Sequence, residues 1–174
     1  MRQVPLGTSG LEVSIFCLGT MYFGWRVDED SAVRVLDQYA EAGGSFLDTA
    51  NIYGQHDGRR VGGLSEAVLG RWMAARRNRQ EMFVTTKVGF QREGVERGLP
   101  AETIVAECER SLRALGTDYI DLYYAHVDDR RTPLSETLEA FDRLVCAGKV
   151  RVVGASNFVA WRMEAAHHLC AANL

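Results

Sequence analysis

Four side chains that could transfer or direct a proton follow short apolar runs along the sequence. Asp48 ends the run "SFLD", Lys87 ends "MFVTTK" and His126 ends "YIDLYYAH". Tyr53 lies five residues beyond Asp48. A carboxylate at the end of a buried strand is costly to remove from water unless a partner compensates its charge. We therefore expect Asp48 to have a partner, and the ammonium group of Lys87 is the candidate.

These residue types suggest a specific kind of chemistry. A tyrosine ordinarily has a pKa of about 10, so it needs help to exchange a proton at neutral pH. An ammonium group nearby stabilises the phenolate; Lys87 could supply it, and Asp48 would hold Lys87 in place. The neutral N–H of His126 could orient a substrate oxygen. Such a set suits proton transfer to an oxygen that becomes an alcohol, as when a hydride reduces a carbonyl. An isomerase or an aldolase could use similar residues.

Each residue also has an ordinary structural explanation. A strand-end aspartate often belongs to a turn, a histidine beside apolar residues is commonly a hydrogen-bonded core group, and a lysine at a strand end usually reaches solvent. A tyrosine after a strand is more often a packing residue, and Ser156-Asn157 after "VVGA" could cap a helix. The functional interpretation depends on their occurrence together, at equivalent ends of successive strands.

The elements that must position these residues follow a repeated order. The segment "RQVPLGTSGLEVS" predicts a hairpin with its turn at 7–10. Short β-forming runs then alternate with segments of helical periodicity, in which one helix face carries Ile104, Cys108, Leu112 and Leu115. This alternation predicts a parallel sheet built from right-handed crossover units. The predicted strands contain "FCLGT", "SFLDT", "MFVTTK", "YIDLYYAH" and "VRVVGAS".

Two α/β architectures could accommodate this order, an open doubly wound sheet or a (β/α)8 TIM barrel. A doubly wound nucleotide-binding sheet usually carries GxGxxG after its first strand, whereas the corresponding connection here reads "CLGTMYFGWRVDED". We favour the barrel, in which active-site residues gather at the carboxyl ends of the strands. A complete barrel takes about 250 residues, and this chain supplies five βα units. We expect residues 1–174 to form a single domain, a partial barrel from a longer protein, with completion by another chain as the alternative.

Composition and charge argue against several classes of protein. A formal net charge of −3 does not favour a nucleic-acid binder. No apolar run approaches the roughly 20 residues that span a bilayer, and the amino end lacks the apolar core of a signal peptide. Four scattered cysteines without metal-ligand spacing predict buried free thiols and a reducing, cytoplasmic setting, with no metal site.

The motifs that carry these residues closely resemble those of the aldo-keto reductase family. They are "LGTSGLEVSIFCLGTMYFG", "FLDTANIYG", "SEAVLGRWM", "VTTKVG", "DYIDLYYAHVDD" and "GASNF". The resemblance runs from about Val4 to the end of the chain and corresponds to the amino-terminal portion of the family, five of its eight βα units. It implies a TIM barrel that uses NADP(H) to reduce a small-molecule carbonyl substrate.

The resemblance also implies roles for individual residues. Tyr53 would be the general acid, His126 would orient the carbonyl, and Lys87 and Asp48 would tune Tyr53. The expected nicotinamide contacts are Gly19, Thr20, Met21, Asp48 near the ribose, and Ser156 and Asn157 at the carboxamide. The longer segment "GFQREGVERGLP" could line the substrate site.

Three functional readings remain open at the level of sequence. The first is an aldo-keto reductase. The second is a non-enzymatic, nucleotide-binding relative of the potassium-channel β-subunit type. The third is an inactive truncated form that depends on partner chains to cover its open sheet edges. We expect no nucleic-acid or membrane partner, and a homo-oligomer is compatible with the sequence.

Overall fold

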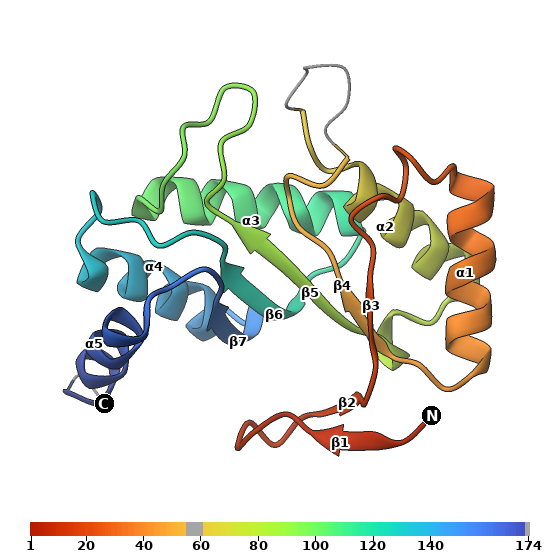
Figure 1. Ribbon diagram of the computed structural model, residues 1–174, viewed down its shortest axis with the longest axis horizontal. Coiled ribbons are helices and arrows are strands. Elements are labelled where there is room, and N and C mark those ends of the chain that lie inside the picture. The colour runs from red at the N-terminus through yellow and green to blue at the C-terminus, as the bar shows by residue number, and fades with distance from the viewer. Residues whose placement is uncertain (55–60, 173–174) are drawn as a thin grey trace.

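Five parallel strands form one curved sheet in the order β3-β4-β5-β6-β7 (Figure 1). The structure, a computed structural model, describes residues 1–54 and 61–172. The strands are β3 (Cys17–Gly19), β4 (Phe46–Asp48), β5 (Phe83–Val88), β6 (Ile120–Ala125) and β7 (Val150–Ala155). Their order in the sheet equals their order in the chain, as in a barrel, whereas a doubly wound sheet reverses direction at a switch point. The predicted partial (β/α)8 barrel is confirmed as an open five-stranded sheet with β3 and β7 at its edges.

A helix follows each strand and lies along the outer side of the sheet (Figure 1). The carboxylate of Asp28 begins the first helix by accepting a hydrogen bond of 2.9 Å from the Ser31 N–H, and Gly116 ends the third in the left-handed conformation, with φ of +62°. The predicted face of the third helix, from Ile104 to Leu115, is buried. The helices are α1 (Glu29–Glu41), α2 (Leu64–Arg76), α3 (Ala101–Leu115), α4 (Leu134–Cys146) and α5 (Ala160–Ala172), with a short 3-10 helix, η1 (Arg79–Glu81).

The predicted amino-terminal hairpin is also present. It consists of β1 (Gln3–Pro5) and β2 (Glu12–Ser14), which pair antiparallel and lie below the sheet in Figure 1. Val13 of β2 packs with Phe83 and Leu122 in a small apolar cluster. Because Phe83 is the first residue of β5, the hairpin closes the amino-terminal end of the sheet, opposite the end where the polar residues lie.

The two faces of the sheet differ in their surroundings, as the side chains of β5 show. Val84 and Val88 belong to the main hydrophobic core between sheet and helices. Side chains alternate along a strand, so Phe83, Thr85 and Lys87 share the opposite, concave face. The apolar end of that face packs on the hairpin, and its polar end carries Lys87.

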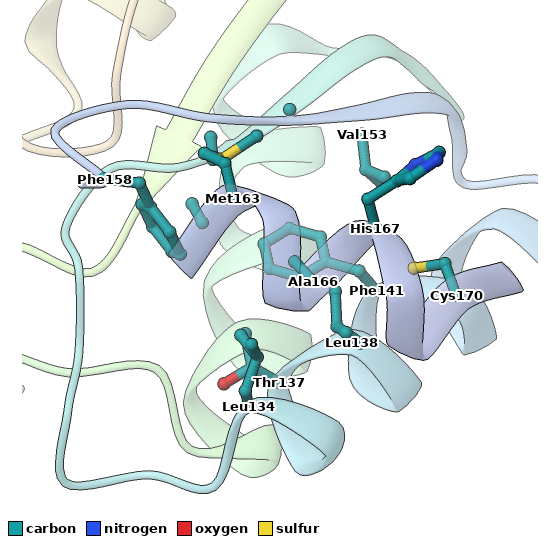
Figure 2. Close-up of a pocket in the computed structure, with 13 residues that line it drawn as sticks. Leu134, Thr137, Leu138, Phe141, Val153, Phe158, Met163, Ala166, His167 and Cys170 are labelled. Carbon is teal, nitrogen blue, oxygen red and sulfur yellow. The ribbon is translucent and has the colours of Figure 1, made fainter. Parts of the chain in front are cut away.

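The last helix covers its strand less completely than the others. A cavity of about 290 Å³ lies between α4, β7 and α5, and its wall includes Phe141 of α4 and Met163 and Ala166 of α5 (Figure 2). Val153 of β7 lines this cavity and is 48% exposed, whereas Val84 of β5 is fully buried. The edge strand β7 is therefore the weakest part of the outer core.

The prediction of four buried thiols is wrong for three of them. Cys108 is buried inside α3, but Cys17, Cys146 and Cys170 are exposed. Cys17 is exposed because β3 is an edge strand. As for membranes, none of the helices within residues 1–54 and 61–172 has the length and apolar character needed to cross a bilayer.

The contact between α2 and α3 yields a test of this packing. A Cβ atom on Gly70 would lie 2.5 Å from the carbonyl oxygen of Ala114, so Gly70 lets the two helices approach closely. Alanine is about 1 kcal/mol better than glycine inside a helix, but overpacking costs about 1–3 kcal/mol. We expect Gly70→Ala to lower the free energy of unfolding by urea. An increase, as helix propensity alone predicts, would contradict the close approach.

Candidate active site

Lys87 is the centre of the polar cluster at the carboxyl end of the sheet. Its side chain lies on the concave face of the sheet, and the residue is only 7% exposed. The ammonium donates hydrogen bonds to Asp48 Oδ2 at 2.7 Å, to the Thr49 carbonyl at 2.6 Å and to Tyr53 Oη at 3.2 Å. Three acceptors match the three N–H groups of an ammonium. The buried charge is therefore compensated by one carboxylate and directed at the tyrosine hydroxyl.

The register of the sheet explains why Asp48 meets Lys87. Asp48, the last residue of β4, is paired with Thr85 of β5, and Lys87 lies two residues further along on the same face. Thr85 donates a hydrogen bond of 2.7 Å to Asp48 Oδ1, so both carboxylate oxygens have partners. Thr85 was missed by the sequence interpretation, although its spacing of two residues from Lys87 was the available signal.

His126 follows β6 directly, and its backbone groups are hydrogen-bonded on both sides. Its backbone N–H donates to the Val88 carbonyl of β5 at 2.8 Å, and its backbone carbonyl accepts a 2.8 Å hydrogen bond from the side-chain Nδ2 of Asn157, just beyond β7. Burial, together with the nearby charge of Lys87, lowers the pKa of His126 to about 4, and the carboxylate of Asp48 opposes this shift in part. The imidazole is therefore neutral at pH 7 and has one N–H to donate.

Tyr53 and His126 lie in the wall of one cavity of about 410 Å³. Their ring centroids are 6.2 Å apart, and Phe90 packs edge-on against His126 at 4.5 Å. Phe90 belongs to the segment "GFQREGVERGLP", which was expected to line the substrate site. The remaining wall is apolar and was not singled out as a substrate wall from the sequence, although these residues lie in loops after predicted strands. It consists of Met21, Trp25, Ile52 and Gly54.

The expected cofactor contacts lie at the ends of three strands, around the same cluster. Met21, beyond β3, lines the cavity, and a Cβ added to Gly19 would meet nothing within 4 Å, so this side of β3 is open. Thr20 differs, because its buried hydroxyl is bonded to the Asp48 carbonyl at 2.9 Å and to Ser65 Oγ at 2.7 Å. Its hydroxyl therefore connects β3 to β4 and α2.

Beyond β7, the Ser156-Asn157 pair has the donor and acceptor groups that suit a carboxamide. Asn157 adopts a left-handed backbone conformation, with φ of +62°, and its Nδ2 also lies 3.1 Å from Ser156 Oγ. The amide oxygen of Asn157 has no hydrogen-bond donor among the residues described. On donor chemistry, Ser156, Asn157 and the carboxylate of Asp48 fit the nicotinamide end of a dinucleotide.

Comparison with known proteins finds a reductase family and individual oxidoreductases that are similar to this chain. A model of the aldo/keto reductase family matches residues 16–173. The uncharacterized oxidoreductase YrpG of Bacillus subtilis (strain 168) is 44% identical over 170 residues, which cover 94% of this chain and 51% of the relative. Norsolorinic acid reductase stcV of Emericella nidulans is 40% identical, over 88% of this chain and 42% of the relative.

A more distant relative carries a cofactor in its name. The aryl-alcohol dehydrogenase [NADP(+)] of Phanerodontia chrysosporium is 33% identical over 96% of this chain and 46% of its own length. The chain thus spans about half the length of these curated relatives.

The lowered pKa of His126 predicts a pH dependence of stability. Because the pKa falls from 6.5 to about 4 on folding, the unfolded chain binds more protons between these values, and the free energy of unfolding should fall as the pH drops from 6.5 toward 4. His126→Gln should flatten this slope in urea unfolding between pH 7 and pH 5. The control is His168→Gln on the exposed side of α5, which should leave the slope of unfolding free energy against pH unchanged. An unchanged slope in His126→Gln would contradict the prediction.

Proposed function

This chain belongs to the aldo/keto reductase family, and on that premise we propose that it carries the reacting groups of an NADPH-dependent oxidoreductase that reduces an aldehyde or ketone to an alcohol. One observation carries the proposal. The buried ammonium of Lys87 lies 3.2 Å from the hydroxyl of Tyr53, in a cavity wall that also contains neutral His126. A proton donor, a charge to stabilise it after the proton leaves, and a hydrogen-bond donor for the substrate oxygen therefore face one space.

In the proposed reaction, the substrate carbonyl lies against Tyr53 and His126. The N–H of His126 hydrogen-bonds to the carbonyl oxygen and orients it. A nicotinamide cofactor held at this site would supply the hydride for the carbonyl carbon. Tyr53 transfers its hydroxyl proton to the oxygen, which becomes the alcohol, and Lys87 stabilises the phenolate left behind. Asp48 keeps the ammonium of Lys87 directed at Tyr53.

The cofactor assignment has two parts with different support. Ser156, Asn157 and Asp48 would hold the nicotinamide and its ribose, with Gly19 and Met21 beside them. The choice of NADPH over NADH is supported by the family and by the relative named aryl-alcohol dehydrogenase [NADP(+)]. Among the residues described, we assign none to a 2′-phosphate.

The cavity wall favours an aromatic carbonyl substrate. Trp25 and Phe90 provide two flat apolar surfaces, and aromatic pairs gain about 0.5–1.5 kcal/mol beyond their area burial. Relatives named for norsolorinic acid reduction and for aryl alcohols support the same class.

Substitution of Tyr53 tests the mechanism. We expect Tyr53→Phe to lower kcat for 4-nitrobenzaldehyde by about 10²–10⁴-fold, because proton donation by a side chain contributes about this factor, and to leave NADPH binding unchanged. Lys87→Met should give a similar loss. The control is Tyr119→Phe, at the amino-terminal end of β6, which should reduce the aldehyde at the normal rate. Unchanged turnover in Tyr53→Phe would eliminate the assigned role.

Substrate choice tests the aromatic wall. We expect 4-nitrobenzaldehyde to have a KM about tenfold below that of a short aliphatic aldehyde, and Trp25→Ala to remove most of this difference by raising the KM for the aromatic substrate, with kcat nearly unchanged. Steady-state NADPH oxidation measures both constants. Equal KM values for the two aldehydes in the unaltered protein would show that the cavity wall does not favour aromatic substrates over aliphatic ones.

A further inference from the structure

We propose that Glu107 of α3 is a positioning residue, which acts through Asn51 and Arg92 to fix the two loops that face each other across the cavity. The first, the Tyr53 loop, is the described part of the connection from β4 to α2, residues 49–54 and 61–63. The second, the Phe90 loop, comprises residues 89–100. The inference rests on the proposed function, in which Tyr53 donates the proton.

Glu107 holds the beginning of the Tyr53 loop through one hydrogen bond. Asn51, which is 1% exposed, donates from Nδ2 to Glu107 Oε2 at 2.8 Å. Its Oδ1 is buried without a hydrogen-bond partner in the described part of the chain, so the side chain is anchored by Glu107 alone. The backbone N–H of Asn51 donates to the carbonyl of Lys87 at 3.2 Å. The position of Asn51 beside Lys87 therefore sets how the chain continues to Tyr53, two residues later.

Glu107 also reaches the end of the same loop. Arg110, one turn further along α3, lies 3.7 Å from Glu107 Oε2 and donates a 2.9 Å hydrogen bond to the carbonyl of Val61. The loop then enters α2, where the N–H of Leu64 donates to the carbonyl of Tyr53 at 3.2 Å. One carboxylate thus contributes to fixing the loop on both sides of Tyr53.

The Phe90 loop is attached to the same carboxylate. Arg92 donates from Nε to Glu107 Oε2 at 2.7 Å and from Nη2 to Glu107 Oε1, which makes a bidentate ion pair. Backbone hydrogen bonds between Arg92 and Val95, and from Gly98 to Gly89, fold the loop back on itself. The ion pair between Arg92 and Glu107 therefore holds the Phe90 loop, including Phe90, against α3.

The electrostatics show that this carboxylate is fully engaged. Burial by itself would raise the pKa of Glu107, but the hydrogen bonds from Arg92 and Asn51 outweigh it and lower that pKa. Removal of one partner would leave a buried charge with fewer compensating donors, which is strongly destabilising. Loss of Arg92 should therefore disturb Asn51 and the Tyr53 loop, although Arg92 itself is not among the residues that line the cavity.

The test compares two ion pairs of nearly equal burial at opposite ends of the sheet. Arg92 and Glu107 have side chains that are 16% and 3% exposed, and Arg79 and Asp121, at the amino-terminal end, have side chains that are 15% and 2% exposed. The variants are Arg92→Gln and Glu107→Gln, with Arg79→Gln as the matched control. The measurements are amide hydrogen exchange in residues 49–54 and kcat for 4-nitrobenzaldehyde, with urea unfolding to record stability.

We expect Arg92→Gln and Glu107→Gln to accelerate exchange in residues 49–54 at least tenfold and to lower kcat about 10–100-fold, because a misplacement of about 1 Å costs about this much. Arg79→Gln should lose comparable stability and change neither measurement more than twofold. If all three variants behave alike, Glu107 only stabilises the fold and the inference is overturned.

Two further outcomes remain decisive. If Glu107→Gln does not fold, Arg92→Gln decides, because it removes the ion pair and keeps the carboxylate of Glu107. If the unaltered protein reduces no carbonyl, the proposed function fails, and hydrogen exchange still shows whether Glu107 positions the Tyr53 loop.

Discussion

The buried ammonium of Lys87 is the interaction on which the rest of the site depends. A charge removed from water is tolerated only when nearby groups compensate it, and here Asp48, the Thr49 carbonyl and Tyr53 take all three N–H groups. Each acceptor comes from the end of β4 or the loop after it, so the ion pair fixes the tyrosine relative to β5. The same positive charge disfavours protonation of His126. One lysine thus supplies the charge beside Tyr53 and helps to keep the imidazole neutral.

The parallel sheet makes this arrangement possible because it separates packing from chemistry. Alternate residues of β5 face the helices, where Val84 and Val88 are completely buried, or the concave side, where Thr85 and Lys87 meet Asp48. The hairpin closes the amino-terminal end of the concave face with Val13. The edges at β3 and β7 lack this protection, which accounts for the exposure of Cys17 and Val153.

The buried carboxylate of Glu107 lies behind the site, on the helical side of the sheet. It differs from the ion pair of Arg79 and Asp121, which fastens β6 at the amino-terminal end with the same burial. The partners of Glu107 include Asn51 and Arg92 in two loops beside the cavity. Those of Asp121 are the backbone N–H of Val84 and the guanidinium groups of Arg79 and Arg151. We infer that one of these charge clusters serves the site and the other serves the fold.

The sequence by itself determined the order of strands and helices, the hairpin and the residues at the strand ends, because apolar periodicity and turn chemistry are local properties. It also placed Asp48, Tyr53, Lys87 and His126 at one end of a sheet. It could not determine which other side chains contact and position these four residues. Thr85, Trp25 and Glu107 are ordinary residues of a strand, a loop and a helix, and the exposure of three cysteines depends on where the sheet ends. These features come from register and from loops packed across long sequence separations, so only the tertiary structure decided them.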